Sequence, residues 1–174
     1  MKLHRKPLLL ALLGSLAVVR AQAGGLGLDI EIPAIDTAEY HRPYVAVWLE
    51  NEDRSIVRDL TVWYDLHMAK DEGRKWLKDL RRWWRVSGRN QEVPPDAVSG
   101  ATKAVGRHSV TIAADDPRLQ GLPAGTYSVA VEASREKGGH ELVRLALPWP
   151  ATDTHRESAR GERELGSVTL TTHP

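Results

Sequence analysis

The sequence predicts an all-β protein, an antiparallel β-sandwich of about seven short strands with one inserted amphipathic helix. Apolar and polar residues alternate over most of the chain, and turn signals separate most of these runs. Alternation at period two places one side of a strand on a core and the other side in water. A single segment has apolar residues at helical spacing, and this segment predicts the helix.

The first predicted strand covers residues 26–32, where Leu26, Leu28, Ile30 and Ile32 alternate with glycine and acidic residues. The same alternation predicts six further strands, at 44–49, 60–66, 110–112, 127–131, 143–147 and 168–170. Because apolar residues recur at every second position, we expect each strand to bury at least one face. In the range 44–49 both faces are apolar.

The connections between these strands carry their own signals. Gly138 and Gly139 lie between two predicted strands and are typical of a hairpin turn. The segment 152–164 is rich in charge and poor in apolar residues, so we predict a mobile loop before the last strand.

The helical spacing covers residues 74–87, and Gly88 follows where the helix should end. Its apolar positions are Trp76, Leu77, Leu80, Trp83 and Trp84. Its other positions carry the basic residues Arg74, Lys75, Lys78, Arg81, Arg82 and Arg85, with Asp79 as the only acid. Two interpretations stay open. In one, the helix packs across the sandwich with buried tryptophans and solvated basic residues. In the other, the basic face attracts an anion or an anionic partner.

The first 23 residues have the three parts of a cleaved secretory signal. Basic residues come first, an apolar run covers 8–19, and Ala21-Gln22-Ala23 forms a small-residue cleavage site. The run is shorter than the ~20 residues that a membrane-spanning helix needs, so we expect it to be removed. The mature protein, residues 24–174, is then expected to be one soluble domain in a bacterial periplasm.

Composition excludes several classes of function. Removal of the signal takes away four of the 24 basic residues and none of the 23 acidic ones, so the net charge falls from +1 to −3. Such a domain has no general attraction for nucleic acid. The chain has no cysteine, and its histidines show no zinc-ligand spacing, so we assign no metal site. It also lacks a Gly-x-Ser-x-Gly elbow and a phosphate loop, so we predict no hydrolase of that type and no phosphate-loop enzyme, while independent catalysis stays open.

The segment 90–107 has no periodicity and is predicted as a loop that contains Asp96-Ala97-Val98-Ser99-Gly100-Ala101-Thr102. These residues resemble the recognition motif of the periplasmic FAD:protein FMN transferase, which is Asp, a small residue, any residue, Ser or Thr, then Gly-Ala-Thr. The resemblance implies that the Thr102 hydroxyl is esterified to the phosphate of FMN. It makes Asp96, Ser99, Gly100 and Ala101 the other cofactor-site residues. The alternative is an ordinary glycine-containing turn in a long loop.

Small residues suit a segment that must enter the active site of another enzyme. Gly100 can adopt backbone angles that other residues avoid, while Ser99 and Ala101 leave little bulk beside Thr102. Asp96 either turns the loop by bonding a backbone N–H or orients Thr102 during transfer, and both roles stay open. The resemblance implies that the magnesium ion for this step belongs to the transferase.

Basic side chains near the motif are candidates to meet the FMN phosphate, and a tryptophan is a candidate to stack on the ring. The basic candidates are Arg81, Arg82 and Arg85 in the predicted helix, and Lys103 and Arg107 beside the motif. These roles require the helix and the motif to meet in the fold.

A second resemblance covers nearly all of the mature chain. It rests on the opening strand, the strand pair 44–65, the tryptophan-rich basic helix, the motif segment 96–106, the turn 123–127 and the segment 135–150. These features resemble the predicted periplasmic family called domain of unknown function 2271. Its members resemble immunoglobulin-like sandwiches and tend to be encoded with the FMN transferase and with PepSY-type membrane proteins.

The second resemblance implies a periplasmic electron-transfer protein. Its covalent FMN would accept electrons from a PepSY-type membrane redox protein, while the chain supplies position and environment. The alternative is an unmodified immunoglobulin-like module that binds a membrane partner, with Thr102 as a turn residue and the basic helix or a sheet face as the contact surface.

Overall fold

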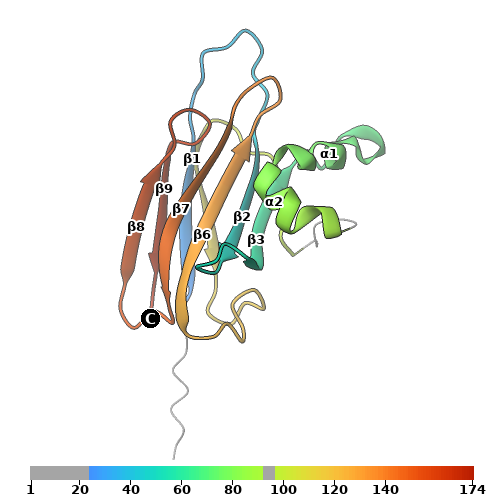
Figure 1. The fold of residues 1–174 in the computed structure, drawn as a ribbon. Helices are drawn as coiled ribbons and strands as arrows, with labels where there is room; N and C mark the ends of the chain where they lie inside the picture. The colour runs from blue at the N-terminus through green and yellow to red at the C-terminus, as the bar shows by residue number, and fades with distance from the viewer. Residues whose placement is uncertain (1–23, 92–96) are drawn as a thin grey trace, which may run out of the picture.

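The computed structural model describes residues 24–91 and 97–174, in which two β-sheets pack face to face (Figure 1). The four-stranded sheet has the order β5-β1-β9-β8, with bounds Gly106–Ile112, Leu26–Ile32, Ser167–Thr172 and His155–Arg160. The five-stranded sheet has the order β4-β3-β2-β6-β7, with bounds Ser99–Ala101, Ile56–Tyr64, Tyr44–Glu50, Gly125–Ser134 and His140–Trp149. The predicted all-β sandwich is therefore confirmed.

The main core lies between the sheets and is built from alternate residues. Strand β1 buries every second side chain from Leu26 to Ile32. Val47 of β2 and Val131 of β6 belong to the same apolar cluster and are fully buried. At the start of β6, the Tyr127 hydroxyl donates a hydrogen bond to the Pro123 carbonyl oxygen, 2.9 Å away, which fixes the turn before that strand. The seven predicted strands correspond to β1, β2, β3, β5, β6, β7 and β9.

Neighbouring strands pair antiparallel, with one exception that concerns the motif. Strand β4 runs parallel to β3 and pairs Ser99, Gly100 and Ala101 with residues 62–64. It therefore forms an edge of the five-stranded sheet. Part of the segment 90–107, predicted as a loop, is thus a short strand, and its backbone is held by the sheet.

A helical segment covers the outer face of the five-stranded sheet (Figure 1). It contains α1 (Glu72–Lys75) and α2 (Arg81–Val86), with 3₁₀ turns at Ala69–Asp71, Leu77–Asp79 and Gly88–Asn90. The single helix predicted at 74–87 is therefore broken at Leu80, whose ψ of 75° is not helical. In the described residues, no helix is long and apolar enough to cross a membrane.

The buried face of this segment forms a second, smaller core. Leu77, Leu80 and Trp83 are at most 2% exposed and pack on residues of β2, β3 and β6, including Trp48. For these residues, the interpretation that the helix packs across the sandwich with a buried apolar face is correct. Trp76 differs, because it is 41% exposed.

The mobile loop predicted at 152–164 contains a strand, β8, so that prediction is wrong for residues 155–160. The segment 152–164 was expected to be a loop, yet residues 155–160 pair antiparallel with β9 at the edge of the four-stranded sheet. The strand is only half-buried, and Ala159 is its only apolar side chain against the core. Charged residues on such an edge hinder pairing with another chain, so an edge strand can be as polar as a loop.

Candidate functional site

Thr102 follows the last residue of β4 and continues the pairing of that strand with β3. Its backbone N–H donates a hydrogen bond to the Tyr64 carbonyl oxygen, 3.2 Å away. The residue is half-buried and lines a pocket of about 390 Å³. The last residue of the motif therefore lies in the wall of a pocket, on backbone that a strand pair holds in place.

The small motif residues of β4 fit closely against β3. A Cβ atom at Gly100 would lie 3.0 Å from Cδ1 of Trp63, so a larger side chain would push against that ring. The sequence suggested unusual backbone angles for Gly100, but its φ is not in the left-handed region and the close approach to Trp63 is the constraint. Ala101 lines the pocket, and Ser99 is half-buried in β4. Asp96 lies outside the described residues.

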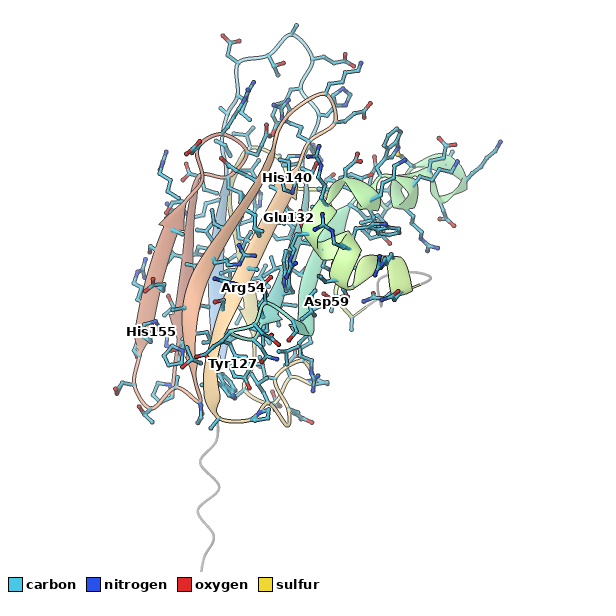
Figure 2. All side chains as sticks on the ribbon, viewed as in Figure 1. Arg54, Asp59, Tyr127, Glu132, His140 and His155 are labelled. Carbon is cyan, nitrogen blue, oxygen red and sulfur yellow. The ribbon has the colours of Figure 1, made fainter. Side chains whose placement is uncertain are left out.

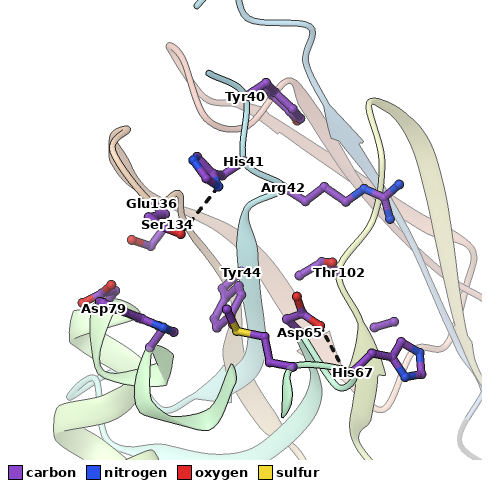
Figure 3. A pocket seen from close by; sticks show the side chains of 13 residues that line it. Tyr40, His41, Arg42, Tyr44, Asp65, His67, Asp79, Thr102, Ser134 and Glu136 are labelled. Atoms are coloured by element: carbon purple, nitrogen blue, oxygen red, sulfur yellow. Dashed lines mark hydrogen bonds and ion pairs between the residues drawn. The ribbon is translucent and has the colours of Figure 1, made fainter. Parts of the chain in front are cut away.

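Segments far apart in the sequence converge on this pocket (Figure 3). Its lining residues come from 40–44 before and at the start of β2, 65–68 after β3, 76–79 in the helical segment, 101–102 at the end of β4, and 134–136 at the end of β6. Trp76 and Thr102 line the same pocket, so the helical segment and the motif do meet, as the proposed roles required.

Apolar and aromatic side chains line part of the pocket. Trp76 is 41% exposed and Met68 is 37% exposed, although Leu77 beside the tryptophan is only 2% exposed. Tyr44 is half-buried and packs edge-on against Tyr64, with ring centroids 6.4 Å apart. Trp76 belongs to neither apolar core, so the pocket offers aromatic surface that these cores do not use.

Tyr44 keeps its phenol proton at neutral pH. Burial raises the pKa of its hydroxyl, and a hydrogen bond with the Asp65 backbone opposes this effect. The negative charges of Asp65, Glu136 and Asp79 raise the pKa further. The pocket therefore contains a neutral phenol beside three carboxylates.

The pocket carries charged groups of both signs, and one arginine lies on the side of Thr102. Figure 3 shows Arg42, Thr102 and Asp65 on one side of Tyr44, and Asp79 and Glu136 on the other. Arg42 is exposed and makes no hydrogen bond or ion pair with another described residue. Its guanidinium group is therefore available to a bound anion at the side where Thr102 lies.

The basic residues that the sequence favoured do not line this pocket. Arg82 is held by the fold, because Nη2 donates a hydrogen bond to the Arg54 carbonyl oxygen at 2.5 Å and Nε lies 3.7 Å from Oε1 of Glu50. Arg81 lines a neighbouring pocket with Lys137.

The two basic candidates beside the motif also point elsewhere. The Lys103 ammonium group lies 5.4 Å from the centroid of the Trp63 ring. Arg107 is exposed on β5, in the other sheet. Arg42, which the sequence analysis did not single out, is the arginine of the pocket, and no motif around it marks it in the sequence.

Among residues 24–91 and 97–174, no three histidine or carboxylate side chains are grouped so that they could hold a metal ion.

The chain belongs to the family described as predicted periplasmic protein (DUF2271), whose model matches residues 25–167. The predicted family and the periplasmic location are confirmed by this match. No curated protein and no solved structure matches the chain.

Proposed function

We propose that this member of the DUF2271 family carries FMN covalently on Thr102 and acts as an electron-transfer protein of the periplasm. A periplasmic FAD:protein FMN transferase would attach the group. The position of Thr102 is the main support for the proposal, because the last residue of the motif lines a pocket of about 390 Å³. Pockets of roughly 300–1,000 Å³ with aromatic walls and a few polar groups are typical of small-molecule sites.

The attachment step needs only a hydroxyl group from this chain. The Thr102 oxygen would form a bond to the FMN phosphorus of FAD, and the bond from that phosphorus to AMP would break. AMP leaves with the electron pair, and the hydroxyl proton passes to a base of the transferase. The chain's contribution is access, because its motif presents small residues beside Thr102 on an edge strand.

Bound FMN supplies the reversible uptake and release of electrons. The chain would position it and set its surroundings, with Tyr44, Trp76 and Arg42 within the same pocket as Thr102. We propose a PepSY-type membrane redox protein as the electron donor. No residue of this chain is assigned a catalytic role.

A second function is favoured by a different observation. Leu66, Met68 and Trp76 are each about 37–41% exposed, and Met68 and Trp76 also line the pocket. Exposed apolar side chains that gather in one region are typical of a protein-binding surface. An unmodified module that binds a membrane partner through this surface is therefore the alternative function.

Co-expression with an active periplasmic FMN transferase separates the two functions. We expect the exported wild-type protein to fluoresce as a flavoprotein after denaturing electrophoresis, because a covalent group survives unfolding. Thr102→Ala should be dark. Thr111→Ala is the matched control, because Thr111 is an exposed threonine on β5 and should leave the fluorescence unchanged. A dark wild-type band, with a transferase that modifies another substrate, would leave the binding module as the function.

A further inference from the structure

We propose that the pocket beside Thr102 is the binding site of the flavin ring, with Tyr44 and Trp76 as its aromatic contacts and Arg42 as the partner of the phosphate. This inference rests on the proposed function, because it concerns the group that Thr102 would carry. It adds where the ring lies in the folded protein and which residues hold it there.

The first argument is the point of attachment. Thr102 lines the pocket itself, so a group esterified to its hydroxyl begins at the pocket wall. A tethered ligand has an effective concentration that reaches the millimolar range for short linkers. Modest contacts are therefore enough to keep the ring in the pocket instead of in water.

The second argument is the unused aromatic surface. Trp76 is 41% exposed, whereas Leu77, Leu80 and Trp83 of the same helical segment are at most 2% exposed. Trp76 therefore contributes little to the smaller core, yet it lines the pocket. A flat aromatic ring stacks well on such a side chain, and Tyr44 offers a second ring in the same pocket.

The third argument is that the Thr102 side of the pocket has an arginine that no described residue pairs with. Arg42 lies on the Thr102 side, where the phosphate must be, and it has no ion pair with a described residue. Arginine binds phosphate oxygens well because its planar guanidinium group donates two parallel hydrogen bonds. Asp65 lies on the Thr102 side as well, where its carboxylate accepts a hydrogen bond from the His67 backbone N–H at 3.0 Å. Asp79 and Glu136 lie on the opposite side, where they can accept a hydrogen bond from a ring N–H (Figure 3).

The neighbouring pocket is the competing place for the ring. It is lined by Arg81 and Lys137 and shares Trp76 and Asp79 with the first pocket. Thr102 does not line it. A test must therefore use residues that belong to one pocket alone, and Arg42 and Arg81 are such a pair.

The test uses flavin-loaded full-length protein and two optical signals of the ring. Stacking on tryptophan or tyrosine quenches flavin fluorescence, and a ring held in a folded protein shows circular dichroism in its visible absorption bands. We expect the emission of the loaded wild type to rise several-fold on unfolding in guanidinium chloride. Trp76→Leu should raise the emission of the folded protein several-fold, and Arg42→Gln should weaken the visible circular dichroism.

Trp84→Leu is the matched control, because Trp84 is a half-buried tryptophan of α2 that lines neither pocket. Its emission should equal that of the wild type. Equal emission of folded and unfolded wild type, with no visible circular dichroism, would overturn the inference while leaving the attachment to Thr102 intact. Loss of the dichroism in Arg81→Gln but not in Arg42→Gln would also overturn it, because the ring would then lie in the neighbouring pocket. A wild type without flavin, given an active transferase, would overturn both proposals.

Discussion

At position 100, within the motif, the packing of β4 against β3 requires a residue as small as glycine. The space beside its Cα is filled by the Trp63 indole, 3.0 Å from where a Cβ would lie. The indole in turn has the Lys103 ammonium group 5.4 Å from its centroid and the His108 ring 6.0 Å away. A larger residue at position 100 would therefore displace β4 from β3.

Gly100→Val should reduce both stability and modification. Forced packing of this kind costs about 1–3 kcal/mol of unfolding free energy, because neighbouring side chains and backbone must shift. We expect a lower urea midpoint and a smaller fraction of flavin-loaded protein by intact mass. Val105→Ala, at an exposed position beyond the motif, should change neither quantity. Full loading of Gly100→Val would show that the strand pair at β4 is not required for transfer.

The sequence singled out Thr102 as a candidate because the motif is a local signal, but it did not predict the other residues of the pocket. Seven consecutive residues carry the motif, whereas Arg42 and Tyr44 come from β2 and the segment before it. Trp76 was expected to share the buried stripe of Trp83, but it is 41% exposed in a helical segment that is broken at Leu80. Such residues become neighbours through strand pairing and helix packing, and these long-range contacts cannot be read from a single sequence.

At the scale of elements, α2 begins where β6 supplies a carboxylate. Glu132 is fully buried and accepts hydrogen bonds from the backbone N–H groups of Arg82 and Trp83, each at 2.8 Å. His140 of β7 contacts the same carboxylate. The first N–H groups of a helix have no partner within the helix, and a negative charge there is favourable. Glu132 therefore caps the start of α2, which follows the break in the predicted helix at Leu80 (Figure 2).

Glu132→Ala should loosen this segment from the sheet. The substitution leaves two backbone N–H groups without an acceptor, and each unsatisfied buried group costs about 1–3 kcal/mol. We expect a lower free energy of unfolding in urea and a change in the fluorescence of Trp83. Glu72→Gln is the control, because its exposed ion pair with Lys75 should contribute at most ~0.5 kcal/mol. Equal losses in the two variants would contradict the role of Glu132.

The elements that the sequence missed are those whose stability comes from pairing more than from their own residues. Strand β4 has only three residues, and its small side chains give no alternation. Strand β8 is a polar edge strand, so its composition is that of a loop. Strand β1, which buries alternate residues, was predicted with its bounds, because burial of one face fixes the pattern. The predictions for β6 and β7 gave the positions of the strands but were shorter than the strands themselves.

At the scale of the whole molecule, several carboxylates tie its stability to pH. A hydrogen bond from Arg118 lowers the pKa of Asp116 to about 2, from an ordinary value of 3.8. Burial acts to raise the pKa of Glu141, but hydrogen bonds from the backbone N–H groups of 162–165 lower it overall. Through these bonds, Glu141 of β7 holds the turn between β8 and β9.

The free energy of unfolding should therefore fall in acid. A carboxyl group with a lowered folded pKa stabilises the fold above its unfolded pKa, and this contribution is lost as the pH falls through the folded pKa. For Asp116 the window runs from about pH 4 down to about pH 2. Urea unfolding at several pH values measures this loss. Glu141→Gln should be less stable at neutral pH and should lose less on acidification. A wild-type urea midpoint that is the same at neutral pH and at about pH 2 would contradict this account.

The overall fold was the most predictable part of the molecule, because independent local signals agree with one another. Examples are the alternation in β1 and the glycine turn before β7. Two sheets that are each apolar on one face can bury these faces by packing against each other, which gives a sandwich. The attachment of FMN to Thr102 is less predictable from the fold. The fold gives the Thr102 side chain a place in a pocket wall, but the transfer itself depends on a second enzyme.

The most direct measurement of this attachment is the mass of the peptide that contains Thr102, after co-expression with an active periplasmic FMN transferase. We expect the exported wild type to gain the mass of one FMN minus one water, with fragment ions that place the addition on Thr102. The Thr102→Ala protein should show the unmodified mass. An unmodified wild-type peptide, or an adduct that persists in Thr102→Ala, would contradict the assignment of Thr102 as the attachment site.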